Sequence, residues 1–337
     1  DGSAWGGGAA GLGRIDPQGR FDTVPLAPRG MTSPAVHSLV RTDSSTLWVA
    51  TETGPLRVRR GRASRPLDYR GEVNEVRRYR DQIWVATDVD GVLVYDLDGR
   101  QLAQLGADEG IANNSAFGFG TDGSGELWVG TWQGACRLTG EGAPACLTSR
   151  DGLSDVRVYD LLADYEGGLW FATHGAGAYR YSGFTGVEDR FVVYDESFGL
   201  LDDSVWGLGA LPNGEILVGH TSGMTRITGE TTRALSTNAG LPGPFVTRMV
   251  PDGSGGLYVG TSGGLARYAS GRFTRIPGVT PGPGEFIGTT YRTSDGRIWT
   301  SVFGDALYVV EGGRGRRVDA ASIGLPNPRV RKMAEGA

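Results

Sequence analysis

Two stretches of the sequence, Leu127–Thr131 (LWVGT) and Leu257–Thr261 (LYVGT), decide the fold. In each, an aromatic residue lies in a short apolar run that ends in Gly-Thr, which is typical of a buried β-strand followed by a turn. The same phrase recurs in weaker form along the chain. With these copies, eight anchor residues mark eight repeats: Trp5, Trp48, Trp84, Trp128, Trp170, Leu217, Tyr258 and Trp299.

The spacing of the anchors shows that the repeats are regular. Successive anchors are 43, 36, 44, 42, 47, 41 and 41 residues apart, and 337 residues shared among eight copies give 337/8, or about 42, residues each. No helical hydrophobic period competes with the strand pattern. An arginine also follows most anchors after nine or ten residues: Arg14, Arg57, Arg137, Arg180, Arg226 and Arg267.

Residues 241–276 show how one repeat is built. Turns rich in glycine, serine and aspartate separate four short strand-like runs, at 245–250, 257–260, 265–268 and 273–276. The last turn, Ser270-Gly271, is a two-residue hairpin signal. Four-stranded units of this length are typical of β-propeller blades, which stack radially and leave only short edges exposed. We interpret the anchors as core residues wedged between neighbouring blades.

The two ends of the chain predict how the propeller closes. The last repeat ends with a strand at Val330–Met333 that no second strand follows, and the chain begins with a strand around Trp5 that no first strand precedes. Joined head to tail, the ends complete one repeat and remove an open sheet edge. The sequence therefore predicts an all-β fold, an eight-bladed β-propeller of four-stranded antiparallel blades in one domain, residues 1–337. Seven blades with a displaced repeat is the alternative.

Composition excludes several classes of function. The net charge is −5, and the 33 basic residues, of which Lys332 is the only lysine, form no basic block, so we expect no nucleic-acid partner. No apolar run approaches the roughly 18 residues of a membrane span, so any membrane contact would come through a segment outside this chain. Three histidines and two cysteines without ligand spacing predict no metal site. No glycine-rich loop opens a helix, and we expect no cofactor and no catalytic residue.

The repeats resemble those of the two-component regulator propeller family. The family pattern is a Gly-Leu-Pro turn, a strand, an Asp-Gly turn and a strand that reads LWVGT. It is matched by Gly240-Leu241-Pro242, Gly324-Leu325-Pro326, Asp252-Gly253 and the LWVGT copies. The resemblance implies a periplasmic or extracellular sensor domain that precedes a membrane helix and an output kinase or cyclase domain in the full-length protein. It also implies a carbohydrate or other small-molecule ligand, or a protein partner.

In a propeller, the loops that connect blades and the loops after the second strands share one mouth of the central channel. Loops on a rigid scaffold are where ligands commonly bind. We therefore expect a ligand site at this mouth, formed by Trp132, His174, His220, Asp155, Arg157 and Arg329. Structural alternatives stay open: the histidines could be ordinary loop residues, Trp132 could fold over its own blade, and Asp155 could be a turn residue.

The predicted function is an extracytoplasmic ligand-sensing propeller of a bacterial membrane signalling receptor, and not an enzyme. Two alternatives stay open. A propeller lyase would need a cluster of histidines and acids with perturbed pKa values at the mouth. A protein-interaction scaffold would need a broad apolar patch.

The two cysteines predict a disulfide. The Ser270-Gly271 turn opposes Ala266 to Arg275, and Cys136 and Cys146 lie at the corresponding positions of their own repeat. Thiols that face each other on adjacent strands satisfy the Cα separation of about 4.4–6.8 Å that a disulfide needs. A disulfide would indicate an oxidising compartment such as the periplasm. The alternative is two small apolar residues in a reducing compartment.

Overall fold

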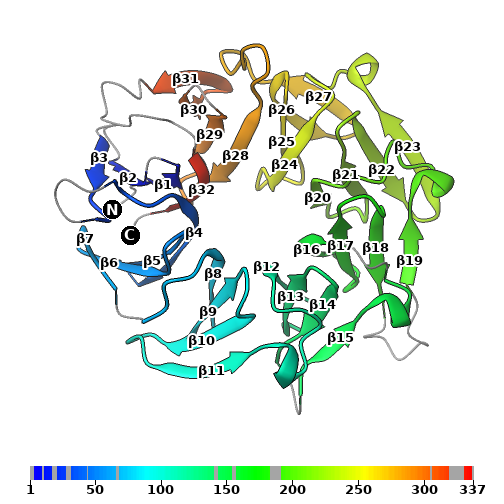
Figure 1. Ribbon diagram of the computed structural model, residues 1–337. Helices are drawn as coiled ribbons and strands as arrows, with labels where there is room; N and C mark the ends of the chain where they lie inside the picture. The colour runs from blue at the N-terminus through cyan, green and yellow to red at the C-terminus, as the bar shows by residue number, and fades with distance from the viewer. Residues whose placement is uncertain are drawn as a thin grey trace. The chain divides into compact units, whose positions relative to one another are not determined.

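The computed structural model describes residues 4–9, 11–16, 21–27, 32–43, 45–65, 68–139, 143–153, 157–182, 191–303, 306–318 and 330–335. Their strands form eight four-stranded antiparallel sheets, the blades of an eight-bladed β-propeller (Figure 1). Helix in these residues is confined to short 3-10 turns such as Ala107–Glu109. The predicted eight-bladed, all-β fold is confirmed, and the seven-bladed alternative is wrong. The chain divides into two compact units, residues 1–104 with 276–337 and residues 105–275.

The first unit contains four blades. Their strands are β1 (Ala4–Gly8), β2 (Gly11–Ile15) and β3 (Phe21–Val24) with β32 (Val330–Glu335); β4 (Val36–Asp43), β5 (Thr46–Thr51), β6 (Leu56–Arg59) and β7 (Arg62–Ser64); β8 (Val73–Tyr79), β9 (Gln82–Thr87), β10 (Val92–Asp96) and β11 (Gln101–Leu105); and β28 (Ile287–Arg292), β29 (Ile298–Val302), β30 (Leu307–Glu311) and β31 (Arg314–Val318).

The first blade joins both ends of the chain. Its strand order is β3-β2-β1-β32, and β32 pairs antiparallel with β1, so that Trp5 lies opposite Ala334 and Gly6 lies opposite Met333. β32 also contacts β28 and β4. The predicted closure by the C-terminal strand is confirmed. It gives β1 a hydrogen-bonded neighbour that the N-terminal sequence does not supply.

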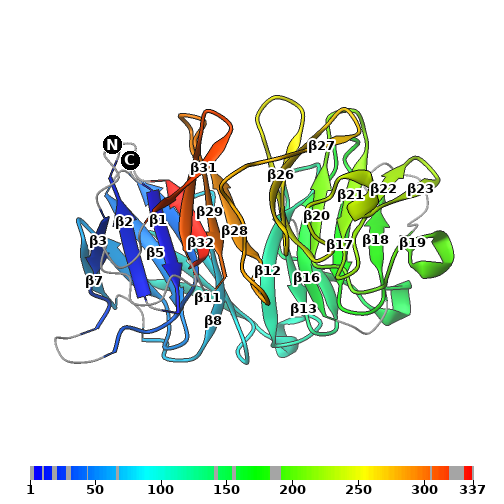
Figure 2. The same cartoon turned by 90° about the horizontal axis from the view of Figure 1, so that it is seen from above.

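The second unit also contains four blades, each formed by consecutive strands. They are β12 (Ala116–Thr121), β13 (Leu127–Thr131), β14 (Gly134–Arg137) and β15 (Ala145–Leu147); β16 (Val158–Ala163), β17 (Leu169–Thr173), β18 (Ala178–Tyr181) and β19 (Phe191–Tyr194); β20 (Gly207–Ala210), β21 (Ile216–Gly219), β22 (Met224–Thr228) and β23 (Thr231–Leu235); and β24 (Val246–Pro251), β25 (Leu257–Thr261), β26 (Gly264–Ala269) and β27 (Arg272–Arg275). The first strands β12, β16 and β20 stand side by side in Figure 1 and Figure 2.

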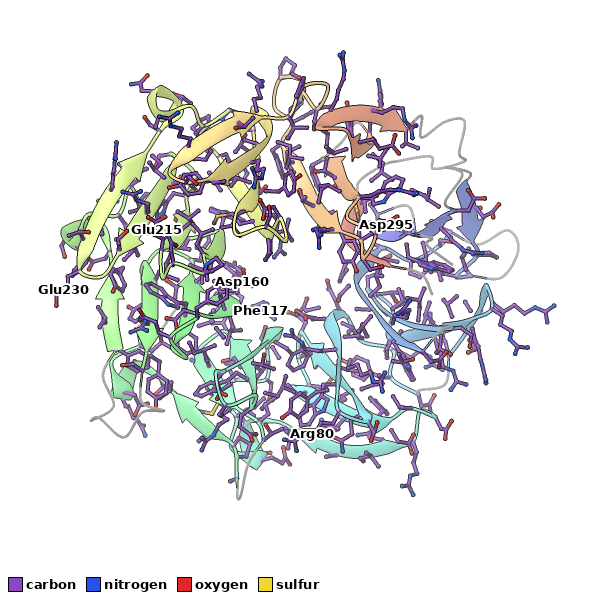
Figure 3. The ribbon with its side chains drawn as sticks, turned by 180° about the vertical axis from the view of Figure 1, so that it is seen from behind. Arg80, Phe117, Asp160, Glu215, Glu230 and Asp295 are labelled. Carbon is purple, nitrogen blue, oxygen red and sulfur yellow. A yellow bond between two sulfur atoms is a disulfide. The ribbon has the colours of Figure 1, made fainter. Side chains whose placement is uncertain are left out.

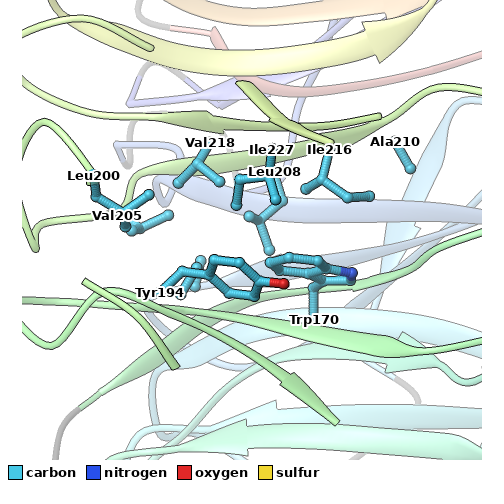
Figure 4. Packing of buried hydrophobic residues seen from close by; sticks show 11 residues of the cluster. Trp170, Tyr194, Leu200, Val205, Leu208, Ala210, Ile216, Val218 and Ile227 are labelled. Carbon is cyan, nitrogen blue, oxygen red and sulfur yellow. The ribbon is translucent and has the colours of Figure 1, made fainter. Parts of the chain in front are cut away.

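The anchor aromatics pack between neighbouring blades. Figure 4 shows Trp170 of β17 and Tyr194 of β19 beside apolar side chains of the next blade, among them Leu208 of β20. Trp128 of β13 packs in the same way against Leu161 of β16. Each aromatic side chain of this kind removes roughly 150–250 Å² from water. The anchors therefore hold adjacent blades together, as the sequence predicts.

The arginine that follows an anchor lies opposite it on the next strand. Trp170 pairs with Arg180, and Asp164 in the preceding turn accepts hydrogen bonds from the indole Nε1 at 2.8 Å and from the guanidinium Nε at 2.7 Å. Burial by itself raises the pKa of Asp164, but these hydrogen bonds outweigh it and hold the pKa below its usual range. Arg267 and Asp252 repeat the contact at 2.6 Å. In these two blades the repeated arginine ties the third strand to the turn before the anchor.

Cys136 and Cys146 are joined by a disulfide between β14 and β15, where the two residues lie directly opposite each other. Their Cα atoms are 4.0 Å apart. This is shorter than the separation of about 4.4–6.8 Å expected from the sequence; directly opposed residues of antiparallel strands lie about 4.5 Å apart where they form no hydrogen bonds with each other. The crosslink fixes the outer hairpin of its blade.

Candidate ligand-binding site

A bulge recurs in the first strands of the blades. In β12 and β16 the register slips by one residue, which leaves Phe117 and Tyr159 as the bulged residues. A bulge of this kind turns a side chain away from the regular ladder. Figure 3 shows Phe117 and Asp160, the residue after Tyr159, at the inner edge of their blades.

The next blade places Trp206 at the same point of the repeat. Trp206 directly precedes β20, and its backbone N–H donates to the carbonyl of Gly219 at 2.9 Å. Three successive blades thus have an aromatic side chain eleven residues before their anchors, whereas other blades have smaller or polar residues there: His37, Thr247 and Gly288.

Ring contacts join these positions into a strip, which we call the aromatic row: Trp132, Phe117, Tyr159, Trp206 and Phe245. The centroids of neighbouring rings are 6.0, 5.5, 6.5 and 5.5 Å apart in this order. Such distances are typical of interacting aromatic side chains. Trp132 and Trp206 are each 42% exposed, and the other three residues are half-buried. The row extends over all four blades of the second unit.

Arg157 contacts two residues of the aromatic row, Trp132 and Tyr159. Its Cζ atom lies 3.3 Å from the centroid of the Trp132 ring, and its Nη1 donates a hydrogen bond of 2.9 Å to the Tyr159 hydroxyl. The guanidinium therefore covers one face of Trp132 in a cation–π contact. Trp132 thus contacts both Phe117 of its own blade and Arg157, which precedes the first strand of the next one.

His174 borders the row between two of its rings. The imidazole meets Tyr159 at 5.8 Å and Trp206 at 6.1 Å between centroids, edge to face in both cases. Its backbone N–H donates to the carbonyl of Arg157 at 3.3 Å. The side chain is exposed. The structure therefore brings three of the residues predicted from the sequence, Trp132, Arg157 and His174, into one site.

His220 is placed differently from the prediction. Its side chain is fully buried, and Nε2 lies 3.0 Å from the Thr225 hydroxyl. Burial lowers the pKa of His220 below its usual value, although the charge of Asp202 opposes the shift. In sister blades a buried threonine takes this position and donates to a loop carbonyl: Thr131, Thr173 and Thr261. His220 is therefore part of the wall of its blade and does not face solvent.

Two further predicted residues, Asp155 and Arg329, lie outside the described residues. Sequence reasoning missed four members of the aromatic row: Phe117, Tyr159, Trp206 and Phe245. The signal for three of them was available, because they occupy one repeat position in successive blades. These side chains come from the start of the first strands, whereas the residues predicted from the sequence lie in loops.

The described residues contain no group of three or more His, Cys, Asp and Glu side chains arranged to hold a metal ion. Among those same residues, no helix is both long and apolar enough to cross a membrane.

A family model matches one repeat that contributes to the site. Residues 152–175 fit the model described as two component regulator propeller. The matched segment includes β16 and β17 and therefore Arg157, Tyr159 and His174. No curated protein matches the sequence.

Solved structures with a similar fold include a sensor domain, a designed propeller and a lyase. The extracellular domain of BT4673 from B. thetaiotaomicron, assigned as a hybrid two component system, aligns with a TM-score of 0.61 and 21% identity over 94% of this chain and 43% of that one. The computationally designed Ika8 protein aligns with a TM-score of 0.62 and 11% identity over 88% and 89% of the two chains. Virginiamycin B lyase from Staphylococcus aureus aligns with a TM-score of 0.54 and 12% identity over 73% and 83%. At these identities the likeness shows the fold alone, and this chain spans less than half the length of the BT4673 domain.

Proposed function

We propose that this chain is an extracytoplasmic ligand-sensing propeller of a bacterial membrane signalling receptor. Its ligand, a small molecule, a glycan fragment or a protein partner, binds at the aromatic row. The observation that supports this most strongly is the row itself: five rings in contact along one strip, two of them exposed tryptophans, with Arg157 and His174 at its border.

The exposed rings are not explained by folding. Thr247 and Gly288 occupy the position of Phe117, Tyr159 and Trp206 in blades that form the same four-stranded sheet. Apolar surface left in water costs about 25 cal/mol per Å². A ligand that covers the row removes this surface from water, and a few polar groups at the border orient it, as in most small-molecule sites.

Two further observations support the location and the role. The matched repeat is described as part of two component regulators, which are signalling proteins. The disulfide between Cys136 and Cys146 favours a periplasmic or extracellular location, because disulfides persist in oxidising compartments. The kinase or cyclase that reports binding would lie outside this chain.

The lyase hypothesis has less support. It requires histidines and acids grouped at the site, and His220, whose pKa is lowered, is buried in the blade wall. The resemblance to a lyase shows a shared fold and assigns no residue. We therefore do not propose an enzymatic activity.

Substitution in the full-length receptor tests the proposal. Trp206→Ala removes an exposed ring of the row, and we expect at least a tenfold rise in the inducer concentration that gives half-maximal output from a transcriptional reporter. Tyr165→Ala is the matched control, because Tyr165 is 61% exposed but lies in the turn between β16 and β17, outside the row. An unchanged response of Trp206→Ala, or an equal loss in Tyr165→Ala, would contradict the proposal.

A further inference from the structure

We infer that the ligand bound at the aromatic row is a carboxylate attached to a six-membered ring, and that Arg157 binds the carboxylate while Trp206 and Tyr159 hold the ring. This inference rests on the proposed function and adds the chemical class of the ligand and the part played by each residue.

One face of Trp132 is already covered by Arg157. An exposed tryptophan at a channel mouth would ordinarily offer a face to a sugar or an aromatic ring. Here Arg157 occupies one face of Trp132, with Cζ 3.3 Å from the ring centroid, and Phe117 lies 6.0 Å away. Trp132 therefore supports the guanidinium from one side, and its role toward a ligand is to position Arg157.

Arg157 uses one of its donors for a hydrogen bond to Tyr159. A guanidinium has five N–H donors in one plane. One of them is directed to the Tyr159 hydroxyl, and no carboxylate among the described residues forms an ion pair with Arg157. Three other half-buried arginines of this unit have such a partner: Arg180 with Asp164, Arg226 with Glu215 and Arg267 with Asp252. A half-buried guanidinium with several donors that no described residue accepts is suited to a planar anion, which it can bind through two parallel hydrogen bonds.

The ring of the ligand would lie against Trp206, next to Tyr159. Tyr159 and Trp206 are nearly parallel, at an interplanar angle of 13°, and His174 meets both of them edge to face. Trp206 is the exposed member of this group. A six-membered ring laid against Trp206 directs a carboxylate substituent toward Arg157, because Tyr159 lies beside Trp206 and its hydroxyl is bonded to the guanidinium.

The shared chemistry of the ligand is thus a ring with a carboxylate, which could come from an aromatic acid or from an acidic sugar. Benzoate and glucuronate represent the two sources, and benzamide and glucose are their neutral counterparts. If only benzoate binds, the ligand is an aromatic acid; if only glucuronate binds, it is an acidic sugar. Either result supports the inference.

Isothermal titration of the chain with these four probes tests the inference. We expect at least one carboxylate to bind about tenfold or more tightly than its neutral counterpart, and Arg157→Gln to remove this difference. Arg80→Gln is the matched control, because Arg80 also lies over an aromatic ring, 4.9 Å from the centroid of Tyr79, but outside the row. It should bind the carboxylate as the unsubstituted chain does.

Three results would overturn the inference: equal binding of a carboxylate and its neutral counterpart, full binding by Arg157→Gln, or no binding of either carboxylate. The neutral probes need no substitution, so misfolding of Arg157→Gln cannot hide the outcome. The proposed function is tested separately by the reporter response of Trp206→Ala. The proposed function is still supported if Trp206→Ala loses the reporter response, even where neither carboxylate binds more tightly than its neutral counterpart.

Discussion

Replacing Asp164 by alanine tests the account of how a blade is held together. One carboxylate oxygen of Asp164 accepts from the indole of Trp170 and from Arg180, and the other accepts from the backbone N–H groups of Glu166 and Gly168 at 2.9 and 2.7 Å. The side chain is 5% exposed. The substitution therefore removes the acceptor of four hydrogen bonds at once, in the turn that precedes the anchor.

The expected loss of stability follows from the hydrogen-bond donors that Asp164→Ala leaves without an acceptor. A buried donor without an acceptor costs about 1–3 kcal/mol, and breaking a buried ion pair by removing one partner costs about 3–5 kcal/mol. The backbone donor of Glu166 lies at an exposed position of the turn and can bond to water, whereas Gly168 is buried and its N–H also loses its acceptor. The indole of Trp170 and the guanidinium of Arg180 account for most of the loss. We therefore expect Asp164→Ala to lower the free energy of unfolding by about 3–5 kcal/mol.

Guanidinium denaturation followed by tryptophan fluorescence measures this loss. Glu166→Ala is the control, because Glu166 also pairs with Arg180 at 2.9 Å but is 68% exposed. An exposed ion pair contributes about 0–1 kcal/mol. A loss below about 1 kcal/mol for Asp164→Ala, or equal losses for the two variants, would refute the reasoning.

Two other predictions concern neighbouring positions of the repeat. Thr42 occupies the repeat position of Asp164, and the Nε1 of Trp48 and the Nε of Arg57 have no hydrogen-bond partner among the described residues. Thr42→Asp should therefore raise the free energy of unfolding by about 1 kcal/mol, measured by the same denaturation, whereas Thr42→Val, which supplies no acceptor, should not. The second prediction concerns acid stability. The folded pKa of His220 is lowered, so the stability due to its neutral ring is fully present above the unfolded pKa of about 6.5 and is lost as the pH falls through the folded value. Denaturation at pH 7.5 and 5.5 should show a smaller loss for His220→Thr than for the unsubstituted chain; equal losses would show that His220 does not contribute.

The sequence was sufficient for the fold because each blade repeats the same physical solution. Buried anchors recur about every 42 residues, and the complementary ends of the chain require closure. The hairpin register likewise placed Cys136 opposite Cys146, since pairing about a short turn is fixed by counting residues. These inferences depend on local periodicity, which is visible without coordinates.

The site was predictable in part. The expectation that ligands bind at loops predicts Trp132, Arg157 and His174, which lie close together in the structure. The stacking of Arg157 on Trp132 was not predictable, because it joins two blades and depends on how their loops meet. The sequence predicts His220 as a loop residue because it follows a second strand, but the buried threonines at the same repeat position indicate a position in the blade wall.

Fluorine NMR of the chain labelled with 5-fluorotryptophan tests the central claim, binding of a ring carboxylate at the aromatic row, most directly. The sequence has eight tryptophans, and substitution by phenylalanine assigns the resonances of Trp132 and Trp206. On titration with benzoate and glucuronate, we predict that these two resonances shift while those of the buried Trp48 and Trp170 stay in place. The account would be contradicted if Trp132 and Trp206 did not respond. It would also be contradicted if the shift occurred at Trp5, which lines a cavity of about 350 Å³ in the first unit.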